Sequence, residues 1–142
     1  MSTYMPKAGD IQRKWYVIDA AGKPLGRVAA QAAVLLRGKQ KTLFAPHVDC
    51  GDHVVIVNCR EAVLTGKKLE KKIAYHPTLY IGHMKKVQYK TLMAEKPCKA
   101  MELAVKGMIP DTTIGRAAMT RLHLFEGAEH THAAQKPQAW EL

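Results

Sequence analysis

The pattern of apolar and polar residues divides the first sixty positions into a strand, a helix and a second strand. Trp15–Ile18 is a continuous apolar run ended by the turn at Ala20–Gly22, which is typical of a strand buried on both faces. Pro24 suits the first turn of a helix, and the residues after it place apolar side chains on one stripe as far as Gly38. His53–Asn58 is a second apolar run. This order predicts a βαβ unit with a parallel strand pair and a right-handed crossover.

The middle of the chain has shorter patterns. Ala62–Thr65 and Ile73–His76 have the character of extended pieces on either side of a lysine-rich connection. A helical period begins at Thr91, is interrupted by Pro97 and continues to Val105. We therefore expect two extended segments followed by a broken helix.

The ten residues that begin at Gly107 connect this helix to another. Gly107 is expected to cap the first helix in the left-handed conformation, and Pro110 prevents the helix from continuing. Thr112 or Thr113 can cap the second helix, which places Arg116 in its first turn. A guanidinium beside a helix N-terminus can hold a phosphate, although an ordinary helix connection with one exposed arginine is the simpler interpretation.

Residues 122–142 hold a short strand and a tail. Leu122–Phe125 is apolar enough for a strand, whereas Gly127–Leu142 has neither a helical nor a strand period. Such a tail is expected to be disordered unless something holds it, and Trp140 could pack back onto the domain or bind a partner.

Composition adds a globular size and a strong positive charge. The chain has 142 residues, 47% of them hydrophobic, which is enough for one domain with its own core. Lys and Arg number 22 against 12 Asp and Glu, and the net charge of +10 indicates a nucleic acid or another anionic surface as partner. Three widely spaced cysteines favour a reducing, cytosolic compartment over a disulfide framework. Neither a membrane-spanning run nor the apolar core of a signal peptide is present in the sequence.

The positive charge is concentrated in one segment. Residues 66–106 contain ten lysines and three glutamates, and Tyr75, Tyr80 and Tyr89 lie among the lysines. A solvated lysine-rich surface is the simpler explanation of such a run. The density of one sign and the interleaved aromatic residues instead favour contacts with phosphates and stacking on unpaired bases. We therefore expect this segment to bind nucleic acid.

Metal binding and catalysis have weaker support. His47, Cys50 and His53 recur every third residue, with Cys59 further on, so they are the best candidate zinc ligands. No second close pair of ligands accompanies them, and the aspartates between them suit a turn equally well. His130 and His132 could join only if the tail folds back. We expect no bound metal, no cofactor and no small-molecule substrate, and because the chain lacks a catalytic motif we expect a binding protein rather than an enzyme.

A helix–turn–helix reader of DNA is the second binding class. Its recognition helix would be Thr113–Leu122, which offers Arg116, Thr120 and Arg121 to base edges. The connection before this helix is longer than the usual turn of three or four residues, and most of the basic excess lies elsewhere. We rank this alternative below RNA binding.

Several blocks of sequence resemble one known family. The chain is similar to the bacterial large-subunit ribosomal protein L-thirteen family in K-W-Y-V-I-D-A-A-G-K-P-L-G-R-V-A at Lys14–Ala29 and in F-A-P-H-V-D-C-G-D-H-V-V-I-V-N at Phe44–Asn58. The similarity continues in V-K-G-M-I-P at Val105–Pro110, in I-G-R-A-A-M at Ile114–Met119 and in E-H-T-H-A-A-Q-K-P-Q at Glu129–Gln138. The blocks occur in order over nearly the whole chain.

This resemblance implies a fold and a function. The fold is α/β, a three-layer α/β/α domain with a small, mostly parallel (mixed) sheet of about four strands built on the N-terminal βαβ unit. Residues 1–142 would form a single ribosomal-protein domain with extended segments at 1–13 and 127–142. The implied function is a non-catalytic structural constituent of the large ribosomal subunit in the cytoplasm, which binds large-subunit rRNA and neighbouring ribosomal proteins and supports subunit assembly. The chain departs from the family pattern at Asp111 and His123, where basic residues are usual.

The candidate rRNA-binding residues follow from charge and position. Lysines would neutralise phosphates as point charges, whereas arginines can grip a phosphate with two parallel hydrogen bonds. The candidates are Arg27, Arg37, Lys39, Lys41, Lys67, Lys68, Lys71, Lys72, Lys85, Lys86, Arg116 and Arg121.

Overall fold

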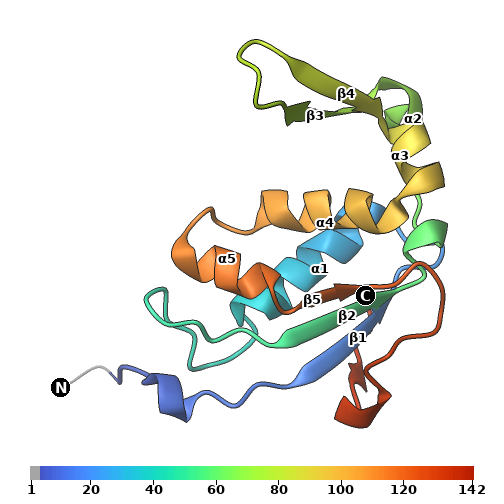
Figure 1. Ribbon diagram of the computed structural model, residues 1–142. Coiled ribbons are helices and arrows are strands. Elements are labelled where there is room, and N and C mark those ends of the chain that lie inside the picture. Colours follow the sequence, from blue (N-terminus) through green and yellow to red (C-terminus); the bar gives the residue numbers. More distant parts are fainter. Residues whose placement is uncertain (1–3) are drawn as a thin grey trace.

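A computed structural model describes residues 4–142, and a four-stranded parallel sheet lies at its centre (Figure 1). Its strands are β1 (Trp15–Asp19), β2 (His53–Val57), β5 (Leu122–Leu124) and β6 (Gln138–Ala139), in the order β5-β2-β1-β6. All three neighbouring pairs are parallel. The predicted βαβ unit is therefore confirmed, with β1 and β2 as its strands.

Helices cover one face of this sheet. α1 (Leu25–Arg37) connects β1 to β2 and packs against α4 (Pro97–Met108), while α5 (Thr113–Met119) contacts α1 further along the chain (Figure 1). α1 ends at Gly38, whose φ of 76° is left-handed, as the sequence predicts. The core lies between the helices and this face, because alternate residues of each strand point the same way. Its fully buried side chains include Ile18, Val28, Leu35, Leu36, Val54, Ile56, Met101 and Val105.

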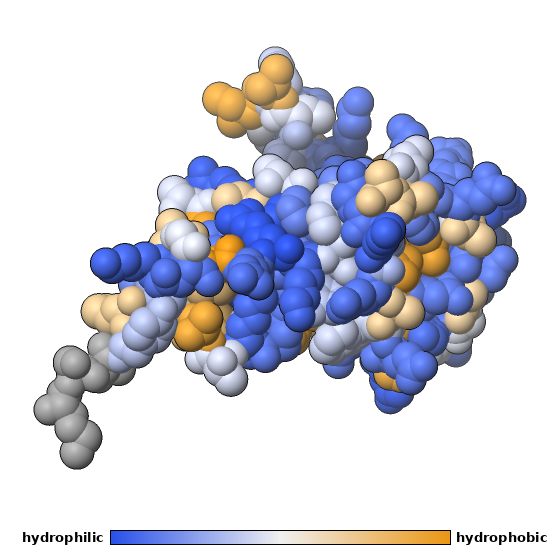
Figure 2. Space-filling view, turned by 90° about the horizontal axis from the view of Figure 1, so that it is seen from below, coloured by the Kyte–Doolittle hydropathy of each residue, from blue (hydrophilic) through white to orange (hydrophobic). Residues whose placement is uncertain are grey.

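The C-terminal segment covers the other face. Trp15 and His53 are neighbours in register and stack with ring centroids 4.2 Å apart, and His123 of β5 continues this row. His132, just before the short 3-10 helix η3 (Ala133–Gln135), packs onto His123 with centroids 4.3 Å apart. Seen from this side the surface is mostly hydrophilic (Figure 2). The predicted three-layer α/β arrangement is confirmed, with helices, sheet and C-terminal segment as its layers.

The C-terminal segment takes the alternative in which Trp140 packs back onto the domain, because β6 pairs with β1 and the amide of Trp140 donates to the carbonyl of Val17 at 2.9 Å. One local prediction was wrong. Gly107 is not the end of its helix, because α4 continues to Met108 and Ile109 is the first extended residue. Pro110 sets this end, since the residue before a proline is disfavoured in helical conformation.

A lysine-rich arm projects from the helical side of the molecule (Figure 1). It begins with α2 (Lys68–Lys71) and continues as an antiparallel pair of strands, β3 (Ile73–Pro77) and β4 (Met84–Gln88), which leads into α3 (Tyr89–Glu95). Ala62–Thr65 is not a partner strand of β3, since only Val63 forms an isolated bridge, to Pro24. Short 3-10 helices, η1 (Ala8–Asp10) and η2 (Cys59–Glu61), complete the elements. Between residues 4 and 142, no helix is long and apolar enough to cross a membrane.

Candidate nucleic-acid interface

Residues 66–90, here called the lysine hairpin, present most of the predicted phosphate ligands to solvent. Lys67, Lys68, Lys71 and Lys72 belong to or border α2, Lys85 and Lys86 lie on β4, and all six are exposed. The hairpin closes where the amide of Tyr89 donates to the carbonyl of Lys72 at 3.0 Å, so the α2 lysines lie at its base. Lys67, Lys68, Lys71 and Lys72 also line an open depression of about 560 Å³ with Thr65 and Gly66. This cluster supplies the positive charge that a phosphate-binding surface needs.

The three tyrosines among these lysines have different surroundings. Tyr75 and Tyr80 are exposed, and the ammonium of Lys86 lies 5.9 Å from the ring centroid of Tyr75. Tyr89 is only 4% exposed and joins the core, with the ammonium of Lys72 4.5 Å from its ring centroid. Stacking on bases is therefore open to Tyr75 and Tyr80 and not to Tyr89.

Arg116 lies in the first turn of α5, as predicted. The Thr112 hydroxyl caps this helix by accepting from the amide of Gly115 at 3.2 Å. The Arg116 guanidinium is exposed, and its Nε lies 3.8 Å from a carboxylate oxygen of Asp111, which is itself almost fully exposed. An exposed pair at this separation contributes little, so the guanidinium can exchange Asp111 for a phosphate. Arg116 also lines a pocket of about 370 Å³ between α4 and α5, together with Lys106.

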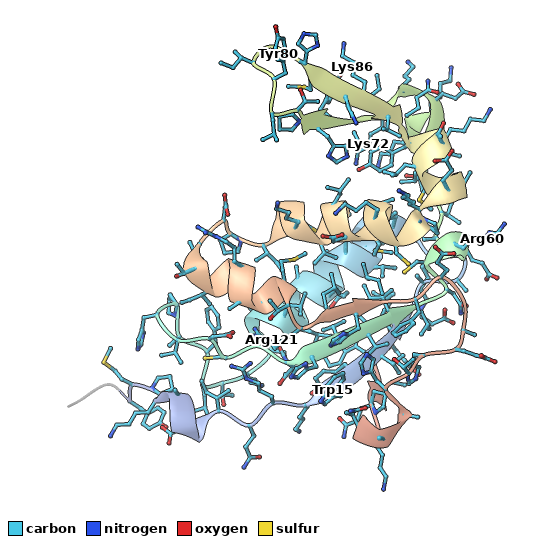
Figure 3. The ribbon with its side chains drawn as sticks, in the orientation of Figure 1. Trp15, Arg60, Lys72, Tyr80, Lys86 and Arg121 are labelled. Carbon is cyan, nitrogen blue, oxygen red and sulfur yellow. The ribbon has the colours of Figure 1, made fainter. Side chains whose placement is uncertain are left out.

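Arg121, predicted to bind RNA, is buried and paired inside the protein. It is 4% exposed, and its two terminal nitrogens donate to the two carboxylate oxygens of Asp49 at 2.6 Å each. The same guanidinium donates to the backbone carbonyls of Leu36 and Ala117. Its position next to the sheet is visible in Figure 3. The terminal nitrogens of this buried guanidinium are paired inside the protein, and its unpaired Nε is itself buried, so no donor is open to a phosphate at the surface.

Lys41, also predicted to bind RNA, is likewise paired inside the protein. Its ammonium lies 2.6 Å from a carboxylate oxygen of Asp52, a residue with no exposed surface, and also donates to the carbonyls of Gln12 and Cys50. The other Asp52 oxygen accepts from the side-chain amide of Gln40 at 2.6 Å. The three donors of Lys41 are thus used inside the protein.

The segment between α1 and β2 is held by these two aspartates. Gly51 lies between Asp49 and Asp52 so close to α1 that a Cβ there would overlap the carbonyl oxygen of Leu36. The P-H-V-D-C-G-D block therefore fastens a long loop to the domain. The residues of this block stabilise the fold and are not arranged to bind a ligand.

Arg27 and Arg37 lie at opposite ends of α1, and Lys39 follows the end of this helix. Arg27 is exposed near the start of the helix, whereas Arg37 and Lys39 lie at its far end. The Arg37 guanidinium is half-buried, 5.7 Å from the ring centroid of Phe44. Ten residues of helix separate Arg27 from Arg37 by about 15 Å, so the structure does not bring them together.

The candidate metal ligands lie in unlike surroundings. Cys50 is buried with its sulfur facing the carbonyls of Leu43 and Val48, whereas His53 stacks on Trp15. Burial raises the pKa of the Cys59 thiol to about 12, which keeps this group protonated. Within the described part of the chain, no three His, Cys, Asp or Glu residues are arranged to hold a metal ion.

Two histidines beneath the sheet are held neutral. Burial lowers the pKa of His53, and the positive charge of Arg121 lowers it further. Burial also lowers the pKa of His123, followed by the effect of His132. Trp15, labelled in Figure 3, lies in the same row of rings. The row packs the C-terminal segment and offers no exposed anion site.

The structure leaves few side chains for the base contacts that the helix–turn–helix interpretation requires. α5 has seven residues, and Arg121 follows it in a buried position. Only Arg116 and Thr120 remain exposed among the side chains proposed to read bases. RNA binding by the lysine hairpin is the stronger interpretation.

Sequence reasoning missed the end of the hairpin. Leu79, Tyr80 and Ile81 form an apolar triplet at its outermost turn, with exposed fractions of 108%, 73% and 96%. Pro77 and Gly82 lie on either side of this triplet. The sequence signal for this exposed turn is an apolar triplet between two turn residues inside a lysine-rich segment.

Comparison with known proteins identifies the family. The model of the family described as "Ribosomal protein L13" matches residues 13–131. The chain is 54% identical over 142 residues to the large ribosomal subunit protein uL13 of Heliobacterium modesticaldum, covering 100% of this chain and 99% of that protein. It is 55% identical over 141 residues to the protein of the same name from Carboxydothermus hydrogenoformans, covering 99% of each. On a match of this extent, the chain belongs to the ribosomal protein L13 family, whose members are structural, non-enzymatic components.

Proposed function

We propose that this protein is a structural constituent of the large ribosomal subunit that binds large-subunit rRNA and supports assembly of the subunit. The names of its relatives support a place in the large ribosomal subunit, and the exposed lysine hairpin supports RNA as the ligand. Neighbouring ribosomal proteins are its other partners, and the cytoplasmic ribosome is its location.

The hairpin lysines are the observation that carries this proposal. Between residues 66 and 90 there are seven lysines and a single acidic residue, Glu70. Each lysine that neutralises a phosphate releases condensed counterions, so affinity falls as salt rises. Arg116 adds a planar fork that can orient the protein on backbone oxygens.

Binding across a salt series tests the proposal. The full-length protein is titrated with a large-subunit rRNA fragment and with duplex DNA. Replacing Lys67, Lys68, Lys71 and Lys72 by Gln should flatten the plot of log affinity against log salt by up to about three units. Arg116→Lys keeps the charge and loses the fork, so it should weaken rRNA binding more than it changes the slope.

Two results would count against the proposal. An unchanged slope in the four-lysine variant would exclude the hairpin as the phosphate-binding surface. Equal competition by duplex DNA would revive the helix–turn–helix alternative. Retention of the protein on purified large subunits through a high-salt wash provides the matching test of subunit association.

A further inference from the structure

The end of the lysine hairpin exposes more hydrophobic surface than a free soluble domain needs. Leu79, Tyr80 and Ile81, here called the hydrophobic tip, are followed by Met84 and preceded by Tyr75, each 54% exposed. In the view from below, hydrophobic side chains project beyond the outline of the body at this place (Figure 2). Contiguous exposed apolar surface of this kind marks an interaction site.

The backbone of the hairpin holds the tip in place before any partner binds. The amide of Thr78 donates to the carbonyl of His83, and the amide of His83 donates to the carbonyl of Tyr80, both at 3.1 Å. The Thr78 hydroxyl lies 2.9 Å from the same His83 carbonyl. Gly82 supplies the φ of 82° that this tight turn requires. A preformed turn lowers the entropy lost when the tip is bound.

The tip is continuous with one face of the hairpin. Tyr75 lies opposite Lys86 in the strand register, and Pro77 lies opposite Met84, so these four side chains share a face. Figure 3 shows Tyr80 at the outer end of the hairpin and Lys86 on the strand below it. An open depression of about 480 Å³ beside the tip is lined by Thr78, Tyr80, His83, Met84 and Lys85.

The positive charge of the hairpin indicates which kind of partner binds the hydrophobic tip. A partner that reaches the tip and then follows β4 meets Lys85 and Lys86, and beyond them the lysines at the base. Such a partner must be anionic along its length and must also offer flat apolar surfaces to the tip. RNA meets both requirements, because its backbone carries the charge and its unpaired bases offer faces for stacking.

We propose that the hydrophobic tip inserts into a non-helical site of large-subunit rRNA, where Tyr80 stacks on an unpaired base. Leu79 and Ile81 act as apolar wedges that cover neighbouring bases. The proposal rests on the rRNA binding proposed above and assigns to the tip a contact that the lysines cannot make. Affinity at the tip comes from stacking, so it is largely independent of salt.

The first test compares substitutions of Tyr80 in the full-length protein. With intact large-subunit rRNA as the probe, Tyr80→Ala should lower affinity about tenfold, and Tyr80→Phe should keep it within about twofold. Both variants should keep the wild-type salt slope. Tyr4→Ala is the matched control, because Tyr4 is 62% exposed and lies outside the hairpin. Equal losses in both alanine variants would overturn the assignment of the contact to the tip.

A photocrosslinker separates RNA from protein as the occupant. Benzoylphenylalanine replacing Tyr80 in the full-length chain is irradiated after incorporation into large subunits. Crosslinks to rRNA are expected. Crosslinks confined to a ribosomal protein, or none, would overturn the proposal.

The two proposals can fail separately. If wild-type protein fails to bind rRNA, the proposed function fails. If wild-type protein binds with a lysine-dependent slope and Tyr80→Ala matches it, only the tip proposal fails.

Discussion

Two basic side chains of the sheet-and-helix body are used in the opposite way to the lysines of the hairpin. In the body, Arg121 and Lys41 point inward and are paired with Asp49 and Asp52. In the hairpin, the lysines point to solvent, and Glu70 is the one acidic residue between positions 66 and 90. The difference shows that the role of a basic residue depends on the carboxylates that the fold places beside it.

The two regions also treat hydrophobic residues differently. The body buries its large apolar side chains between sheet and helices, whereas the hairpin exposes Leu79 and Ile81 almost completely. The largest exposed fractions among the apolar side chains of the described residues are therefore at the hydrophobic tip.

Breaking the Arg121 pair should have the largest effect on the body. Arg121→Ala removes a buried bidentate partner from Asp49, so the free energy of unfolding should fall by about 3 kcal/mol. Lys68→Ala, the matched change in the hairpin, should change it by less than about 0.5 kcal/mol. Urea unfolding followed by circular dichroism measures both. Equal losses would contradict the division between the two regions.

A matched pair of lysines tests the same division through RNA binding. Lys68→Gln should reduce the salt slope of rRNA binding by about 0.7 to 0.9, because an exposed phosphate contact is lost. Lys41→Gln should leave the slope unchanged and lower stability, because its charge is used by Asp52. Binding is measured at a temperature where circular dichroism shows both variants to be folded. A reduced slope for Lys41→Gln would show that this lysine reaches RNA.

Acid should weaken the body before it affects the hairpin. The pKa values of His53 and His123 are lowered from 6.5 by burial, so below that pH the unfolded chain binds more protons than the folded one. This contribution to stability is complete above about pH 6.5 and is lost as pH falls toward the lowered values. We expect the Tm to fall between pH 7.5 and 5.5. Replacing both histidines by Phe should make this fall smaller, and an unchanged fall would contradict the assignment.

Thiol labelling should give the smallest effect. The pKa of Cys59 is raised to about 12 by burial, followed by the influence of Cys98, so little thiolate exists at neutral pH. Iodoacetamide should leave Cys59 unmodified in the native protein and label it after denaturation in urea. Mass spectrometry of tryptic peptides measures the difference. Rapid native labelling would show that this part of the core opens readily.

Sequence alone predicted the elements whose signal is local. The apolar runs at Trp15–Ile18 and His53–Asn58 and the stripe between them are sufficient for a βαβ unit, although only β2 is buried nearly throughout and β1 buries alternate residues. β6 was missed because Gln138 and Ala139 have no strand pattern, and they pair only where β1 leaves a free edge. The end of α4 was misplaced because Pro110 acts more strongly than Gly107.

The candidate interface divides in the same way. The exposure of the lysines can be predicted, since charge density excludes burial. The pairing of Arg121 with Asp49 joins residues 72 positions apart, which no local pattern reveals. The hydrophobic tip was missed because only the closed turn shows that its three side chains point outward.

The pairing of β6 with β1 has a consequence for synthesis of the chain. β1 lies between β2 and β6, and residues 138 and 139 of β6 come far later in the chain than β1 and β2. During translation β1 therefore has an open edge until Gln138 and Ala139 have been made, although its βαβ unit can form much earlier. Such an edge is a template for wrong pairing. A nascent chain of this protein is therefore open to aggregation or to chaperones at this edge before β6 emerges.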